Sequence, residues 1–199
     1  MSADSDSPQA DELAYLYRPS LLGAPWSFRL TPVGLAWEVG RRSGRIPYRD
    51  VRRVRLSFKP VGMQRQRYQT EIWAGDAPKL TLVSSSWKSM VEQERQDQSY
   101  SVFVTALHRR LTEAGAPASY EKGGAPLRYW PGLAVFWGIS LGLAYLVVRA
   151  LLSHGLAAAA FIAAFLALFV WQSGGYFRRN RPGVYSPDAL PEMLMPKRA

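Results

Sequence analysis

A long apolar block near the C-terminal end constrains this chain more than any other feature. Residues 129–177 carry a single formal charge, Arg149. Within the block, the runs YWPGLAVFWGISLGLAYLVV (129–148) and LAAAAFIAAFLALFVW (156–171) are uncharged. The first run forms a helix of about 30 Å, which is the thickness of a bilayer core. The second run can span the bilayer core together with its flanking residues. One helix through the whole block would be about 60 Å long, which is about twice that thickness. The sequence therefore predicts a transmembrane helical hairpin over 129–177 with a turn near 153–155.

Arg149 has two interpretations. With helices at about 129–149 and 155–174, Arg149 falls at the far interface, where its long side chain can reach the head groups as an anchor. A functional charge inside the membrane would need a carboxylate partner, and neither helix supplies one. The flanking basic residues are Lys122, Arg128, Arg178, Arg179 and Arg181. By the positive-inside rule we expect both termini in the cytoplasm, and the acidic N-terminus lacks a secretory signal.

Both helices carry small residues at four-residue spacing. These residues are Ala134, Gly138 and Gly142 in the first helix and Ala159, Ala163 and Ala167 in the second. Small residues on one face allow helix backbones to approach closely in a membrane. Either the two helices pack on each other through these faces, or one face docks onto a partner membrane protein.

The part of the chain before the hairpin is polar and has the pattern of a small β domain. We expect a disordered leader over 1–18, a domain over 19–118 and a linker over 119–128. Short alternating runs separated by Gly and Pro predict antiparallel strands. Apolar residues at helical spacing before Gly115 then predict one amphipathic helix, on which His108 is expected at the surface or partly packed. The fold class is therefore α+β, with the helix closing a curved sheet or partial barrel.

The segment FRLTPVGLAWEVGRRSGRIPYRDVRRVRLSF (28–58) resembles the PH-like domains of bacterial membrane proteins that have two transmembrane helices. The resemblance rests on the LTPVGL hairpin and on IPYRDVRRVRL leading into a strand. It implies a non-catalytic recognition scaffold tethered to the cytoplasmic side of the bacterial inner (plasma) membrane. It carries over no ligand and no residue roles.

A dense basic region lies within 41–67, and we single out Arg52, Arg53, Arg55 and Lys59 as candidate contacts with the lipid surface. Such a run is commonly the solvated face of a sheet. For a domain tethered to a membrane, anionic lipid is the nearest partner, and each basic side chain near that surface contributes about 1 kcal/mol. Nucleic acid is a weaker candidate, although the net charge of the chain is +10.

The tail over 178–199 is basic and rich in proline, which favours an extended conformation. Apolar residues lie between the prolines, and Tyr185, Leu190 and Leu194 are the candidate docking residues. An extended peptide with spaced apolar side chains is suited to binding in a groove. That groove belongs either to the domain of this chain or to another subunit.

The sequence offers no pattern for catalysis or for a cofactor. Cysteine is absent, and the two histidines, His108 and His154, have no metal-ligand spacing. We therefore expect a non-enzymatic membrane-anchored interaction protein, an accessory subunit, assembly factor or scaffold whose partners are membrane lipids and a membrane protein. The alternative is a module that binds or senses anionic lipid.

Overall fold

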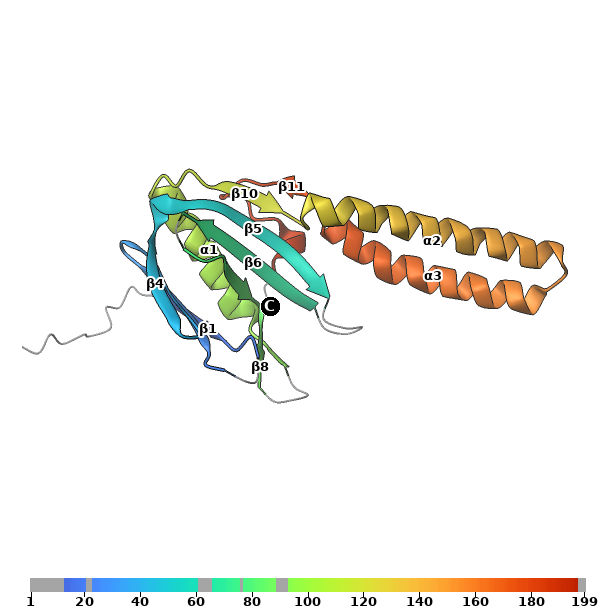
Figure 1. Cartoon of the computed structure of the whole chain (residues 1–199), viewed down its shortest axis with the longest axis horizontal. Helices are drawn as coiled ribbons and strands as arrows, with labels where there is room; N and C mark the ends of the chain where they lie inside the picture. Colours follow the sequence, from blue (N-terminus) through green and yellow to red (C-terminus); the bar gives the residue numbers. More distant parts are fainter. Residues whose placement is uncertain (1–12, 21–22, 61–65, 76, 89–92, 197–199) are drawn as a thin grey trace, which may run out of the picture.

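The computed structural model of the chain describes residues 13–20, 23–60, 66–75, 77–88 and 93–196. It has an α+β fold, in which a β domain adjoins two long apolar helices that project from one side (Figure 1). The first sheet has the order β1-β2-β3-β4, formed by β1 (Leu13–Tyr17), β2 (Trp26–Thr31), β3 (Gly34–Val39) and β4 (Arg42–Pro47). Its neighbouring strands are all antiparallel.

The second sheet has the order β11-β10-β5-β6-β7. Its strands are β5 (Val51–Pro60), β6 (Gln66–Ala74), β7 (Leu80–Val83), β10 (Ser119–Lys122) and β11 (Gly183–Val184). The β10–β5 pair is parallel, and the other pairs are antiparallel. The shorter elements are β8 (Ser85–Trp87), β9 (Gln93–Arg95) and the 3₁₀ turns η1 (Tyr48–Asp50) and η2 (Glu192–Leu194).

Helix α1 (Asp97–Glu113) joins the two sheets into one core. Its buried face contains Tyr100 and Phe103, which recur at helical spacing as the sequence predicts. The Tyr100 hydroxyl lies 2.6 Å from Thr70 Oγ1 on β6, and the Phe103 ring centroid lies 5.7 Å from that of Tyr15 on β1. The helix therefore contacts both sheets.

The prediction of a disordered leader over 1–18 is wrong for its last residues, because Leu13–Tyr17 form β1. Tyr15 and Tyr17 are 2% exposed, and their hydroxyls donate hydrogen bonds to the carbonyls of Val83 and Thr81 on β7. Burial raises the pKa of both phenols, which remain donors. The alternating LAYLY sequence is ordered because β2 supplies backbone partners and the core takes the rings. Residues 1–12 lie outside the described residues.

The predicted linker over 119–128 is also wrong, since Ser119–Lys122 form β10 and the next helix begins at Pro126. β10 pairs with the edge of β5, and β11 from the tail pairs with β10. Without β10, the N–H and C=O groups along this edge of β5 would have no backbone partners. Pairing with β10 supplies them.

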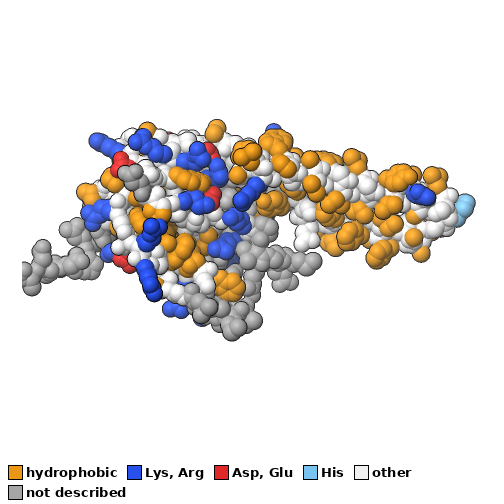
Figure 2. All heavy atoms as spheres, in the orientation of Figure 1, with side chains coloured by type: hydrophobic (Ala, Val, Ile, Leu, Met, Phe, Trp, Pro, Cys, Tyr) orange, Lys and Arg blue, Asp and Glu red, His pale blue; other side chains and the backbone are white. Residues whose placement is uncertain are grey.

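The hairpin consists of α2 (Pro126–Leu152) and α3 (Leu156–Arg179). α2 extends beyond the predicted 129–149 at both ends, and α3 extends beyond the predicted 155–174 at its C-terminal end. Both helices are long and apolar enough to cross a membrane. They turn at 153–155, where His154 has a positive φ of 56°. Phe136 packs between the helices, with its ring centroid 5.5 Å from that of Phe169 and 5.2 Å from that of Phe177. Most other apolar side chains of the hairpin are exposed, which Figure 2 shows as hydrophobic atoms along its length.

The tail packs on the chain's own β domain. Leu194 and Met195 belong to the core, at 2% and 8% exposed, and Tyr185 and Leu190 pack against it partly buried. The sequence leaves two alternatives for the docking of the tail, the chain's own domain or another subunit. In the structure, Tyr185, Leu190 and Leu194 pack on the chain's own domain.

Leu194→Ala is expected to destabilise the β domain by about 2–4 kcal/mol, because it leaves a cavity at a fully packed site. Met193→Ala is the matched control, since Met193 is 50% exposed and its truncation is expected to change stability by less than about 0.5 kcal/mol. Urea unfolding of the full chain in mild detergent measures both. Equal stability of the two variants would contradict the placement of the tail in the core.

Candidate functional site

The outer face of β5 and β6 carries a network of ion pairs around Trp73. Arg53 lies 3.3 Å from Glu121, and Arg55 donates from Nε to the same carboxylate at 2.9 Å. Glu71 on β6 accepts from Lys79 at 2.9 Å and lies 4.0 Å from Arg55. The charged groups of Arg53, Arg55 and Lys79 lie 5.5, 5.1 and 5.7 Å from the Trp73 ring centroid.

This network offsets most of the local positive charge, with three cations against two carboxylates. Glu121 lies on β10, within the segment for which the sequence predicts a linker, so the sequence does not indicate this partner. An arginine already bound to a carboxylate has less to gain from a lipid phosphate, because it must give up one charge-assisted hydrogen bond to form another.

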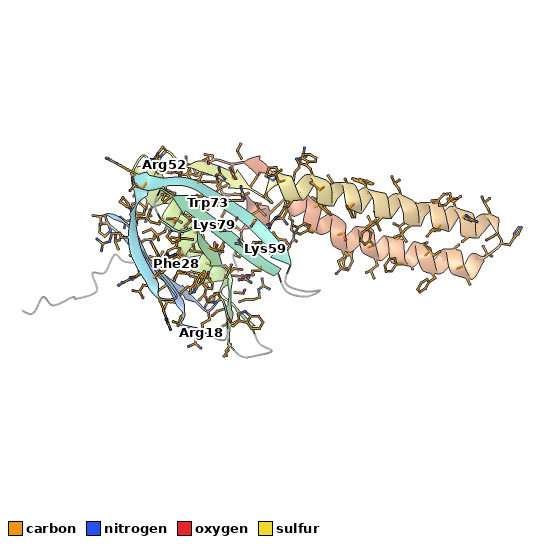
Figure 3. The ribbon with its side chains drawn as sticks, viewed as in Figure 1. Arg18, Phe28, Arg52, Lys59, Trp73 and Lys79 are labelled. Carbon is orange, nitrogen blue, oxygen red and sulfur yellow. The ribbon has the colours of Figure 1, made fainter. Side chains whose placement is uncertain are left out.

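The four candidate lipid contacts do not form one patch. Arg52 is exposed near the end of β5 that is distant from the hairpin, whereas Lys59 lies near the hairpin (Figure 3). Desolvation lowers the pKa of Lys59, Glu71 opposes this effect, and the cations Lys79, Arg67 and Arg128 lower the pKa further. Since Arg128 belongs to the first turn of α2, Lys59 is part of the basic surroundings of the hairpin base.

The edge of β5 is bonded directly to the hairpin base. Beyond the end of β10, the Gly123 N–H donates to the Leu56 carbonyl at 2.7 Å, and the Phe58 N–H donates to Asn180 Oδ1 at 3.0 Å. Asn180 is 1% exposed and follows α3 directly, and its carbonyl accepts from the Gly124 N–H at 2.8 Å. We call this set of contacts between β5, Gly123, Gly124 and Asn180 the junction.

The junction requires glycine at position 123. Gly123 has a positive φ of 82°, and a Cβ there would lie 2.5 Å from the Asn180 carbonyl oxygen and 2.4 Å from that of Arg181. Both clashes are with backbone, which cannot move aside as a flexible side chain can. The junction therefore connects the start of α2 and the end of α3 to the sheet through direct hydrogen bonds, with no flexible linker between them.

His108 connects the tail to α1, and the expectation of a surface or partly packed position is wrong because this residue is 1% exposed. Its Nδ1 donates to the Val104 carbonyl at 2.7 Å, so Nε2 accepts from the Tyr185 hydroxyl, also at 2.7 Å. Burial lowers the pKa of His108 to about 4, which keeps the ring neutral at physiological pH. The partner of His108 is distant in sequence, and no local pattern indicates it.

The small residues of the hairpin divide between two faces. Ala159 on α3 is buried and Ala163 is partly buried, whereas Ala134, Gly138, Gly142 and Ala167 are exposed. A Cβ added to Gly138 or Gly142 would meet nothing within 4 Å. The prediction that the two helices pack on each other through the small residues of α2 is therefore wrong, because that face of α2 points away from α3.

No group of three or more His, Asp or Glu residues suited to a metal ion occurs in the described parts of the chain. Comparison with protein-family models, with curated proteins and with solved structures finds no match. The structure defines an α+β protein with largely antiparallel sheets and two helices that can cross a membrane, joined by the junction.

Gly123→Ala is expected to destabilise the protein by about 2 kcal/mol or more, because the new side chain is strained at positive φ and meets two carbonyl oxygens. Gly124→Ala is the matched control, since its Cβ would lie 3.7 Å from the Asn180 carbonyl oxygen at ordinary contact. The Tm of each purified variant in mild detergent gives the comparison. If Gly123→Ala melted at the temperature of the control, the junction would not depend on this glycine.

Proposed function

We propose that the chain is a non-enzymatic membrane-anchored interaction protein, an accessory subunit, assembly factor or scaffold of a bacterial inner-membrane complex. Its hairpin crosses the membrane, both termini are cytoplasmic, and its β domain is a PH-like recognition scaffold. The observation that carries this proposal is the junction. A domain that needed only an anchor could be attached by a flexible linker, whereas bonded backbone gives the domain one orientation relative to the hairpin.

Three features support the membrane part of the proposal. The apolar side chains of the hairpin face outward, so lipid is the solvent that accounts for them. Lys122, Arg128, Arg178 and Arg181 lie at the open end of the hairpin, and only Arg149 lies near its turn. Trp130 and Trp171 are exposed toward the ends of the predicted spans, where indole rings favour the interface.

The order of the elements supports a PH-like domain. Consecutive antiparallel strands form two sheets, and the helix that follows them packs against both. This is the arrangement expected of a partial barrel closed by a C-terminal helix.

The outer face of α2 is the best candidate for a contact with another membrane helix. Ala134, Gly138 and Gly142 are exposed on it, and close approach of a second backbone would bury them. The predicted docking residues of the tail, Tyr185, Leu190 and Leu194, are already packed on the β domain, so they no longer support a second docking element.

The alternative function, lipid sensing by the basic strand β5, has less support. Arg53 and Arg55 are bound to Glu121, and Arg52 lies at the far end of the strand from the hairpin (Figure 3).

Single-cysteine labelling tests the topology, and the absence of natural cysteine gives a clean background. In intact spheroplasts, an impermeant thiol reagent is expected to label Ser153→Cys at the turn and to leave Ser186→Cys in the tail unlabelled. Both positions are exposed in the structure, and lysed membranes serve as the control in which both react. Labelling at 186 but not at 153 would reverse the proposed orientation.

Gly138→Leu tests the docking face. Leucine remains apolar but prevents close helix approach, so co-purification of a stoichiometric membrane partner in mild detergent is expected to fall at least about tenfold, with normal membrane insertion. Gly175→Leu is the matched control, because Gly175 on α3 is equally open, with nothing within 4 Å of an added Cβ. A parent protein that purifies as a lone monomer, or equal loss in both variants, argues against the proposal.

A further inference from the structure

A basic cleft lies where α3 meets the tail. It has a volume of about 720 Å³ and is lined by the basic residues Lys122, Arg178, Arg179 and Arg181 and by two segments of the tail, 182–184 and 191–194. Figure 2 shows Lys and Arg side chains gathered where the β domain meets the hairpin. Because Lys122 lies on β10 and Arg178 on α3, the cleft exists only when the tail and the junction are in place.

The charge of this cleft is not offset as that of the β5 network is. Glu192 is the one carboxylate among the described residues that line it. Among the residues that the structure describes, no ion pair joins Lys122, Arg178 or Arg181 to a carboxylate. Arg179 has a partner already, because its guanidinium lies 4.7 Å from the Phe58 ring centroid at the junction.

The rim of the cleft is apolar and exposed. Val184 is 77% exposed and Met193 is 50% exposed, although their neighbour Leu194 is buried. Gly183 leaves room for the Lys122 side chain, since a Cβ there would lie 3.0 Å from Lys122 Cε. Cations beside exposed apolar side chains match a ligand that has both an anionic and an apolar part.

The position of the cleft along the hairpin agrees with such a ligand. From Leu156 to Arg179, α3 rises about 36 Å, slightly more than the bilayer core of about 30 Å. With the turn at the far interface, Arg178 and Arg181 lie just outside the core, at the depth of the lipid phosphates. This step rests on the proposed membrane insertion.

We propose that the cleft binds the phosphate head group of one anionic phospholipid. Lys122, Arg178 and Arg181 donate charge-assisted hydrogen bonds to the phosphate, and Val184 and Met193 contact the apolar part of the lipid. The site is distinct from the β5 strand residues and uses the tail as one of its walls. It makes the position of the hairpin base sensitive to the lipid composition of the leaflet.

The test is native mass spectrometry of the full chain in mild detergent, titrated with phosphatidylglycerol or with phosphatidylcholine of the same acyl chains. The parent protein is expected to bind one phosphatidylglycerol with preference over phosphatidylcholine. The double variant Arg178→Gln/Arg181→Gln is expected to bind phosphatidylglycerol about 10- to 30-fold more weakly. The matched control Arg41→Gln/Arg42→Gln, at the β3–β4 turn away from the hairpin, loses the same charge and is expected to bind as the parent does.

Two further arms separate the possible outcomes. If the Gln variant does not fold, Val184→Asp places a carboxylate at the exposed rim and is expected to weaken phosphatidylglycerol binding. Inorganic phosphate is added as competitor, and full displacement at concentrations that leave the parent folded would identify a site for soluble phosphate and overturn the lipid proposal. Equal phosphatidylglycerol binding by the parent, by Arg178→Gln/Arg181→Gln and by Val184→Asp would also overturn the proposal. So would the absence of a preference for phosphatidylglycerol over phosphatidylcholine.

The outcome is independent of the partner complex. Gly138→Leu is expected to retain phosphatidylglycerol binding, so loss of the docking face and loss of the lipid site are separate results. Reversed cysteine labelling would refute the proposed topology, whereas unchanged lipid binding by the cleft variants would refute the cleft alone.

Discussion

The rest of the structure depends on hydrogen bonding along one edge of β5. The backbone groups of this edge are paired first with β10 and then with Gly123 and with the Asn180 side chain. A strand edge left open in a small sheet is unstable and prone to pair with other chains. In this protein the pairing groups come from the two ends of the hairpin. The bonds that complete the sheet are therefore also those that orient the helices.

The same arrangement gives the tail a structural role. After α3, the chain turns back to add β11 beside β10, and Leu194 enters the core of the β domain. His108 and Tyr185 add a partly buried hydrogen bond between α1 and the tail, and the low pKa of His108 keeps its Nε2 an acceptor. An unpaired group at this depth would be costly, so the tail and α1 are coupled. The hairpin is thus inserted between two parts of one folded unit.

Positive charge is distributed according to the partners that the fold supplies. On β5 and β6, the cations surround Trp73 and are balanced by Glu71 and Glu121. At the hairpin base, Lys122, Arg178 and Arg181 line a cleft that contains one carboxylate. The number of basic residues along the chain does not distinguish these two sets of cations. They differ in their carboxylate partners, and Glu121, the partner of Arg53 and Arg55, comes from a distant segment.

Local periodicity by itself determined the hairpin, its turn at 153–155 and the buried face of α1. These features depend on neighbours within a few residues, so hydropathy and spacing predict them. Only the tertiary structure decided that β1 and β10 are strands, that the tail packs on its own domain, that Glu121 pairs with Arg53 and Arg55, and that Gly138 faces away from α3. Apart from the orientation of Gly138, each of these depends on a partner outside the local segment. For β1 and β10, the partner is the edge of another strand, whose backbone groups need hydrogen bonds. For Leu194 the partner is the apolar core. For Arg55 it is a carboxylate that attracts the arginine only once folding brings the two groups together.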